Sequence, residues 1–489
     1  MTHRRCRITR ISVRGASYSL KVGPWGIAIA LGMGLVLQAS PGDASWVTKS
    51  LTAAEPKNAV DVNLGATWDL ASKTAKITRE WIREGEAVDV RDLIYEEEIQ
   101  RLLLQLRVGL FHDVELRLQA PLIFNETRAI RFADGVSDVN STLCCEGTSQ
   151  LADDSSYPYN PRYPITTAPG ERHRAGWGDM TFGIGWSPFV DYKDEAYPTL
   201  TLRADITAPT GKQRNPADLN ALSSSDPAPV GMGLTVFDLS LGVSKRMREE
   251  TPSFDPYFLL GAELPIPSEG QRKLGMDPPI KGRFLVGTEV IVYEDEKLKQ
   301  RFALDFSFQT TYISTGRTYS ELSEFLPNFN RTAVSRDPSP VKDSDYEYDD
   351  FNEPGHYANQ VPGQKCGKIE GVACGELNQV DQYLNLQGQA AVHLQFTEFS
   401  LIRAGVQLQH DTGHFLTNEH TGTDLDPAGA AATCDGGNEQ CSGVLNVVNS
   451  RGEDERSAYW DPRYDTPGRR IRIEQVMNWT FFVTGAATF

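Results

Sequence analysis

The feature that most constrains the fold is an alternation of apolar and polar residues with a period of two. Between Val62 and Leu70 most alternate side chains are apolar, while Asn63, Thr67 and Asp69 fall between them. This period is typical of a β-strand with one apolar face and one polar face. The pattern therefore predicts an all-β protein.

Twelve segments have the character of strands, at residues 60–70, 101–110, 114–124, 179–189, 199–208, 234–247, 257–266, 284–293, 301–313, 382–397, 400–409 and 470–489. Short turns such as 111–113 alternate with long loops at 128–176, 317–380 and 418–468. This arrangement is typical of a transmembrane antiparallel up-and-down β-barrel with long extracellular loops. The stretch 71–83 either prolongs the first strand or forms its own, so we expect about twelve strands, with fourteen as the alternative.

A soluble β-sandwich is the rival fold, because its strands alternate in the same way. Many of the segments have about ten residues, the length that a tilted strand needs to cross a bilayer, whereas most sandwich strands are shorter. Aromatic residues also gather near the strand ends, as interfacial girdles do. The barrel is therefore the favoured interpretation.

The N-terminus has the character of a secretory signal peptide. Six basic residues precede or flank the start of the apolar run 25–37, and small residues follow it. The run is shorter than the roughly 20 apolar residues that a membrane-spanning helix needs. We expect residues 1–44 to be removed, residues 45–56 to form a short periplasmic segment, and residues 57–489 to form the barrel.

The net charge argues against one class of partner. Loss of residues 1–44 lowers the 48 basic and 65 acidic residues of the whole chain to 42 and 64, a formal charge of −22. Such an acidic chain is a poor ligand for nucleic acid. A second apolar run of helical-span length is also missing from the sequence, which excludes a helical membrane protein.

The last predicted strand has the features of a membrane-assembly signal. Trp479, Phe481, Val483 and the terminal Phe489 share one of its faces. A terminal aromatic residue on an alternating strand resembles the C-terminal signal that the barrel-assembly machinery recognises in bacterial outer-membrane proteins. We therefore expect the chain in the outer membrane of a Gram-negative bacterium, in contact with lipid and lipopolysaccharide, with its oligomeric state left open.

Three stretches, 107–116, 176–180 and 208–211, also follow one another in a familiar order. They resemble the turn and strand-end motifs of the outer-membrane transporter family, also called the MetA-pathway phenol-degradation family. The resemblance covers chiefly residues 57–315. It implies an outer-membrane channel for small solutes, with aromatic molecules among the candidates.

If the apolar faces meet lipid, the opposite faces line a lumen. The charged residues expected there are Arg107, Glu115, Arg117, Asp179, Arg203, Asp205, Asp238, Glu263, Glu289, Asp305, Arg403 and Glu474. Burying them without partners would be costly, so we expect cross-strand ion pairs, above all among Arg107, Glu115 and Arg117. A filled, braced lumen and a conducting path are equal alternatives, and the lumen is expected to be polar throughout.

The six cysteines that follow the signal peptide fall in the long loops, as Cys144 and Cys145, Cys366 and Cys374, and Cys434 and Cys441. In an oxidising compartment the last two pairs would staple short loops, although six cysteines allow fifteen pairings. Adjacent cysteines lack the spacing of a zinc site. We expect neither a metal site nor a cofactor.

One constellation suggests catalysis. His410, Thr412 and His414 share the lipid-facing phase at the outer end of a strand, and nucleophilic catalysis needs such a base beside a hydroxyl. An outer-membrane lipid esterase at His410 and Thr412 is therefore the least favoured alternative to a non-enzymatic barrel. A surface adhesin, or a structural barrel with binding loops, is the stronger rival of the channel.

Overall fold

A computed structural model describes residues 48, 61–83, 86–110, 113–143, 170–191, 193–247, 252–295, 297–325, 341–342, 375–397, 400–417, 455–456, 468 and 470–489. The expected signal peptide and all six cysteines of the loops lie outside these residues. The expected periplasmic segment 45–56 also lies outside them, apart from Thr48.

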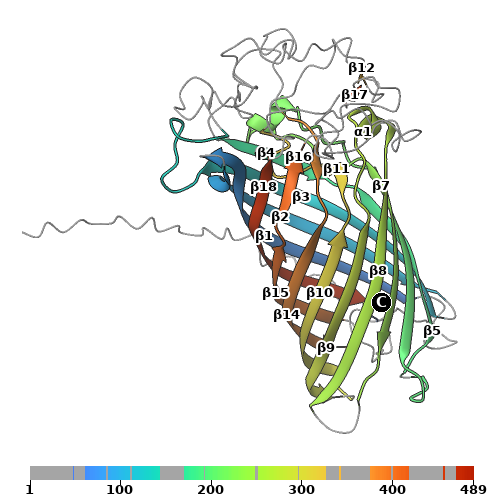
Figure 1. The fold of residues 1–489 in the computed structure, drawn as a ribbon. Helices are drawn as coiled ribbons and strands as arrows, with labels where there is room; N and C mark the ends of the chain where they lie inside the picture. The colour runs from blue at the N-terminus through green and yellow to red at the C-terminus, as the bar shows by residue number, and fades with distance from the viewer. Residues whose placement is uncertain are drawn as a thin grey trace, which may run out of the picture. The chain divides into compact units, whose positions relative to one another are not determined.

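Twelve antiparallel strands form a closed barrel (Figure 1). In barrel order they are β1 (Asp61–Arg83), β2 (Glu86–Gly109), β3 (Val114–Phe132), β5 (Met180–Phe189), β6 (Thr199–Ala208), β7 (Leu234–Ser244), β8 (Ser253–Pro267), β9 (Lys281–Asp295), β10 (Gln300–Ile313), β14 (Tyr383–Thr397), β15 (Ser400–Asp411) and β18 (Ile471–Thr488). Each strand pairs with the next, and β1 pairs with β18. The predicted all-β barrel of twelve strands is confirmed, and residues 71–83 prolong β1 instead of adding a strand.

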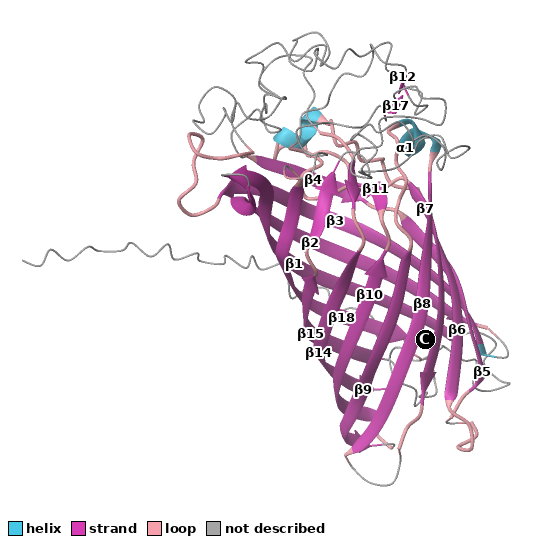
Figure 2. Cartoon of the chain, viewed as in Figure 1, coloured by secondary structure: helices cyan, strands magenta, loops and turns pink. Residues whose placement is uncertain are grey.

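Little helix accompanies the barrel (Figure 2). Within the part of the chain that the structure describes, helical turns include α1 (Glu269–Lys273) and a 3-10 turn, η3 (Leu219–Leu222). None of the described helices has both the length and the apolar composition needed to cross a membrane. Two short strands, β12 (Val341–Lys342) and β17 (Glu455–Arg456), pair in a separate sheet.

The barrel has a turn end and a loop end, and we call the half at the turn end the lower half and the half at the loop end the upper half. At the turn end β1 begins, β18 finishes and tight turns join neighbouring strands; the long connections lie at the loop end. Two backbone hydrogen bonds join Val62 to the terminal residue: the Val62 N–H donates to the Phe489 carbonyl (2.9 Å), and the Phe489 N–H donates to the Val62 carbonyl (2.7 Å). The terminal residue thus takes part in the pairing that closes the barrel.

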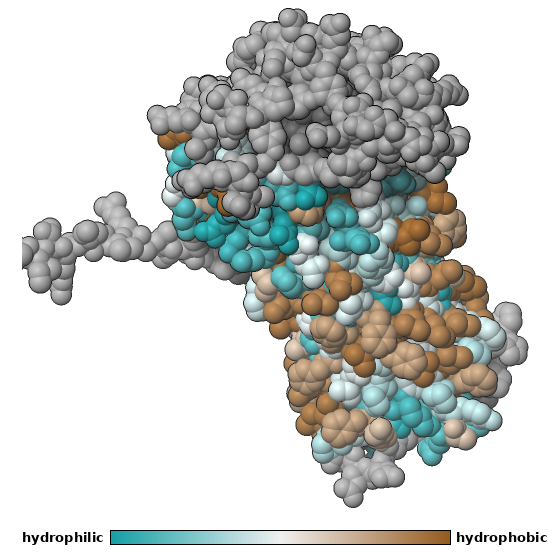
Figure 3. All heavy atoms as spheres, viewed as in Figure 1, coloured by the Kyte–Doolittle hydropathy of each residue, from teal (hydrophilic) through white to brown (hydrophobic). Residues whose placement is uncertain are grey.

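An apolar belt covers the outer wall of the turn-end half (Figure 3). Every barrel strand contributes at least one exposed large apolar side chain to it: Trp68, Leu104, Leu116, Ile184, Leu202, Leu239, Leu260, Val286, Phe306, Phe396, Ile402 and Phe481. Large apolar side chains are ordinarily buried, and a continuous exposed patch of them marks an interaction surface. The alternation in the sequence thus produces an inside-out barrel over this half.

Towards the loop end the polarity of the two faces reverses. On β1, Asn63 and Asp69 point inward near the turn end, whereas Ala75 and Ile77 are the buried inward residues near the loop end. Leu93 on β2 and other side chains join Ile77 in a buried cluster inside the barrel, the mouth cluster: Ala75, Ile77, Leu93, Tyr95, Ile130, Leu143, Leu322, Phe325, Val380, Leu416, Ile471, Ile473 and Val476. The expectation of a polar lumen throughout is therefore wrong for this end.

Several strands extend beyond the ranges expected from the sequence. The structure adds residues at the loop ends of β1, β2 and β3, and it places short strands at the edges of the predicted loops: β4 (Glu171–Trp177), β11 (Gly316–Thr318), β13 (Asn378–Val380) and β16 (His414–Thr417). The outward residues at the loop ends of β1 and β3 include Thr74 and Arg131, so the outward apolar pattern that marks the lower strands is interrupted here. A register shift on β3 between Ile123 and Glu126 also reverses the phase of the alternation.

Candidate functional site

Among the described residues, the lower lumen, inside the apolar belt, includes three groups of ion pairs that join several strands. In the first, Arg107 lies 2.5 Å from Glu115 and Arg117 lies 2.9 Å from Asp205. Arg117 also approaches Glu115, with 3.8 Å between Nε and Oε1. The pairing predicted among Arg107, Glu115 and Arg117 is confirmed, and these pairs join β2, β3 and β6 across the inner wall.

Two glycines on β5 leave room for this first group. A Cβ atom on Gly183 would lie 1.7 Å from Asp205 Oδ1, and one on Gly185 would lie 2.8 Å from Glu115 Cγ. Both contacts are far inside van der Waals distance, so a side chain at either position would displace an ion pair. The glycines of β5 are therefore part of the lumen architecture.

The second group joins β7, β8 and β9. Arg283 donates to Asp238 over 2.5 Å, and its other guanidinium nitrogen lies 3.3 Å from Glu263. Lys281 adds a second cation 3.0 Å from Glu263. The two carboxylates were expected from the sequence; their basic partners were not singled out, although both lie on the inward phase of β9.

The third group crosses β8, β9, β10, β14 and β15. Glu289 binds Arg301 (2.9 Å) and His393 Nδ1 (2.8 Å). Asp305 accepts a hydrogen bond from Arg403 (2.9 Å) and another from the Tyr257 hydroxyl (2.5 Å). Tyr257, Arg301 and His393 were missed in the sequence, where their inward position in the alternation was the available signal.

Two residues expected in the lumen, Arg203 and Asp179, differ in their surroundings. Arg203 lies on the inward phase of β6, opposite Gly185 on β5 and Ser240 on β7. The Asp179 carboxylate instead accepts backbone N–H bonds from Gly211 (2.9 Å) and Met232 (2.8 Å), and so fixes the loop between β6 and β7.

Glu474 differs from the expectation made for it. Ile471 and Ile473 are its buried neighbours on β18, so Glu474 occupies the opposite, outward phase and pairs with Arg472 (3.2 Å). Gln475 has a positive φ of 50°, which marks an irregularity in the strand. Counting back by twos from Phe489 therefore gives the wrong face beyond this point.

At the turn end, one residue of the segment before β1 lies inside the barrel, against its inner wall. Thr48 is fully buried. Its carbonyl accepts a hydrogen bond from the Thr201 hydroxyl (2.8 Å), and its own hydroxyl lies 2.7 Å from that of Ser244. The chain thus contacts β6 and β7 at this level before it enters β1.

At the loop end, residues 320–325 form a segment that we call the latch. Lys73 on β1 binds Glu321 over 2.7 Å, and Arg174 on β4 binds Glu324. Leu322 and Phe325 belong to the mouth cluster. The latch thus combines apolar contacts with buried ion pairs, and it packs against the inner face of the barrel at this end.

The ion pairs of the latch keep its carboxylates charged. Burial alone would raise the pKa of Glu321, but the Lys73 ammonium and the positive potential of His414 outweigh burial and lower this pKa to about 2. The pKa of Glu324 is also lowered, because Arg128, Arg174 and Arg214 together outweigh its burial. Both carboxylates are therefore anionic at neutral pH.

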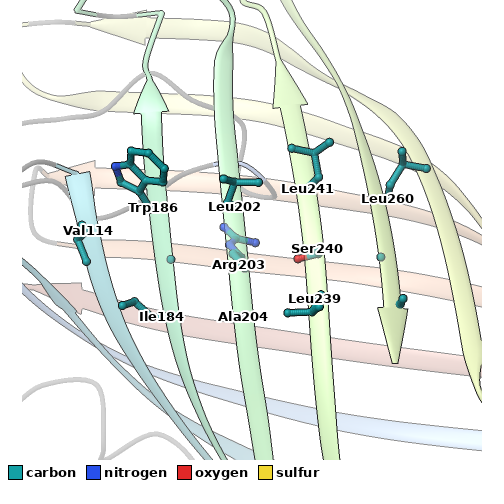
Figure 4. A pocket seen from close by; sticks show the side chains of 13 residues that line it. Val114, Ile184, Trp186, Leu202, Arg203, Ala204, Leu239, Ser240, Leu241 and Leu260 are labelled. Carbon is teal, nitrogen blue, oxygen red and sulfur yellow. The ribbon is translucent and has the colours of Figure 1, made fainter. Parts of the chain in front are cut away.

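An apolar depression on the outer wall has a volume of about 780 Å³. Exposed side chains of neighbouring strands surround it, among them Trp186, Leu202 and Leu260 (Figure 4). Small residues such as Ala204 and Gly261 also line it. The depression is a shallow feature of the apolar belt.

The residues of the esterase alternative do not form a catalytic pair. The His410 ring nitrogen Nδ1 lies 2.9 Å from the Val476 carbonyl, and the Thr412 hydroxyl accepts a bond from the Leu384 N–H (3.0 Å). His414 is buried and stacks on Tyr383, with ring centroids 4.3 Å apart, so it does not share the outward phase expected for it. Each group is engaged with a different neighbour.

Comparison with known proteins gives distant likenesses. No protein-family model matches the sequence, and no curated protein matches it. The COG4313 outer membrane channel from Pseudomonas putida F1 has a TM-score of 0.37 and 11% identity, covering 92% of this chain and 100% of that one. The outer membrane protease OmpT from Escherichia coli has a TM-score of 0.26 and 8% identity, and the match covers 90% of this chain and 99% of that one. The outer membrane protein OprG from Pseudomonas aeruginosa has a TM-score of 0.22 and 8% identity, and the match covers 88% of this chain and 96% of that one.

These likenesses establish no family. The features that bear on function are those of the barrel itself.

Proposed function

We propose that the protein is an outer-membrane channel for small solutes, closed at its loop end in this structure. The observation that carries the proposal is the polarity of the barrel wall: over the same strands, apolar side chains face outward and ion-paired polar side chains face inward. Such a wall suits a bilayer outside and a polar path inside. A soluble barrel would bury the apolar face instead.

The remaining parts of the proposal follow from the sequence. Residues 1–44 would act as the signal peptide for export in a Gram-negative bacterium, and the strand ending in Phe489 would address the chain to the barrel-assembly machinery. Lipid and lipopolysaccharide would surround the apolar belt. A place in the MetA-pathway phenol-degradation family, with aromatic solutes, rests on the three motifs described above.

Ion selectivity across a planar bilayer tests the channel. Replacing Arg117→Gln removes one cation beside Glu115 and Asp205, so the lumen becomes more negative and the reversal potential in a salt gradient should shift towards cation selectivity. Arg131→Gln is the matched control, because Arg131 is half-exposed on the outer wall near the loop end and pairs with Glu96 there. Currents whose selectivity responds equally to both variants, or a barrel that never conducts, would contradict the proposal and favour an adhesive or structural barrel.

A further inference from the structure

Three arginines around the latch converge on one residue, Glu324: two approach its carboxylate and one its backbone carbonyl. Arg174 binds Glu324 through Nε, and Arg214 lies 3.9 Å from the same carboxylate oxygen. Arg172 donates to the Glu324 backbone carbonyl over 3.3 Å. We call Arg172, Arg174 and Arg214 the mouth arginines; they come from β4 and from the loop between β6 and β7.

The mouth arginines are held by contacts that do not involve the latch carboxylate. Arg174 donates to the carbonyls of Pro229 (2.7 Å) and Asn215 (2.9 Å). Arg214 binds Glu126 on β3, and Arg172 donates to the Glu171 carbonyl over 2.9 Å. The guanidinium groups would therefore stay in place if the latch carboxylate left, and a preorganised site of this kind loses little entropy on binding an anion.

Glu324 fills this site incompletely. Its second carboxylate oxygen, Oε2, is buried and has no hydrogen-bond partner among the described residues, and the same is true of Arg214 Nε. A buried polar atom without a partner costs free energy. An external carboxylate with freedom to adjust its position could satisfy both sides better than a side chain constrained by the latch backbone.

Apolar groups adjoin the carboxylate. The Arg172 guanidinium lies over the Phe325 ring, 4.8 Å from its centroid. Phe325 and Leu322 pack into the mouth cluster beside Leu143 and Ile130. The latch therefore presents an anionic group next to an apolar ring, and the wall of the mouth is complementary to both.

We propose that the mouth arginines are a binding site for a small organic carboxylate with an apolar part, and that Glu324 and Phe325 occupy this site as an internal ligand. The proposal rests on the proposed channel and names the class of solute that would displace the latch. The solute carboxylate takes the place of Glu324, and its apolar part takes the place of Phe325.

Calorimetric titration of the full chain in detergent with benzoate tests the site. Glu324→Ala removes the internal carboxylate and leaves a buried, uncompensated Arg174, so benzoate should bind this variant at least tenfold more tightly than the wild type. Benzyl alcohol, which has the ring without the charge, should bind neither protein. Adding Arg174→Gln to Glu324→Ala should abolish the gain.

Glu269→Ala is the matched control, because Glu269 pairs with Lys273 on the exposed surface of α1 and should leave benzoate binding unchanged. Heat-modifiable migration on a gel reports whether each barrel is folded. If Glu324→Ala does not fold, Glu324→Gln retains the shape of the side chain and should show the same direction of change. Equal benzoate affinity in wild type and either folded Glu324 variant, or equal binding of benzyl alcohol, would overturn the proposal.

The titration does not depend on conduction. Benzoate binding by a barrel that never conducts would remove the channel and keep the site. A conducting barrel whose Glu324 variants ignore benzoate would keep the channel and remove the site.

Discussion

The turn-end and loop-end halves of the barrel are built from the same strands with opposite polarity. Around the turn end, Leu239 and its neighbours in the belt face outward, and charged residues such as Asp305 are buried inside. Around the loop end, Ile77 and Leu93 are buried inside and Thr74 faces outward. The comparison shows that the wall suits two surroundings along its length: an apolar outer surface suited to lipid in the lower half, and a more polar outer surface around an apolar interior in the upper half.

The largest expected effect concerns the core of the upper half. Ile77 and Leu93 are both fully buried in the mouth cluster. Truncating either to alanine should lower the free energy of unfolding by about 2–5 kcal/mol, because a buried cavity remains. Denaturant titration in lipid vesicles measures this change in the free energy of unfolding. Leu93→Ala with a loss below about 0.5 kcal/mol would contradict a packed interior at this end.

The second effect concerns the outer wall. Arginine in place of Leu239, in the middle of β7, should cost about 2–4 kcal/mol, because the charge would face the bilayer midplane. Thr74→Arg is the matched control on the outer wall of the upper half, where water solvates the charge and the change should be close to zero. The same denaturant titration compares the free energies of unfolding of the two variants. Equal losses would show that the two halves do not differ in their surroundings.

The third effect is a pH dependence confined to the latch. The pKa of Glu321 is about 2 in the folded protein and 4.5 in the unfolded reference. Because the folded value is depressed, the Lys73–Glu321 pair stabilises the latch above pH 4.5 and loses its contribution as the pH falls from 4.5 towards 2. Hydrogen exchange of the latch peptide, corrected for its intrinsic rate, should accelerate over this range. Unchanged protection of the latch from hydrogen exchange between pH 4.5 and 2 would contradict the claim that the Lys73–Glu321 pair holds the latch.

The smallest effect concerns an exposed ion pair on the outer wall. Arg131 and Glu96 lie 2.8 Å apart with side chains that are 51% and 44% exposed. Such surface pairs contribute about 0.2–1 kcal/mol. A double-mutant cycle with alanine at both positions measures the coupling, and a value above about 2 kcal/mol would mean that this surface is buried against something in the membrane or in an assembly.

The lower half of the barrel was predictable and the upper half was not, for a physical reason. In the lower strands one rule holds, apolar outward and polar inward, so alternation places Arg107, Glu115 and Asp305 correctly. In the upper strands the irregularities near Ile123 and Gln475 change the phase, and the apolar residues turn inward between charged ones. The outward apolar pattern that identifies the lower strands is interrupted in the upper strands, so it cannot predict how far those strands extend.

The latch was also beyond the reach of the sequence. Arg174 and Glu324 are 150 positions apart, and Lys73 and Glu321 are 248 apart. Nothing local marks Glu321 or Glu324 as buried, because both lie in what reads as a long polar loop. Only the folded barrel brings the two acids against β1 and β4.

Single-channel recording of the wild type and Glu321→Gln tests the central claim most directly. The claim is that a conducting lower lumen is closed by the latch. We expect the same unitary conductance in both proteins, because the lumen is unchanged, and a higher open probability in the variant, because Lys73 loses its anionic partner. Equal open probability, or silence in both, would contradict it.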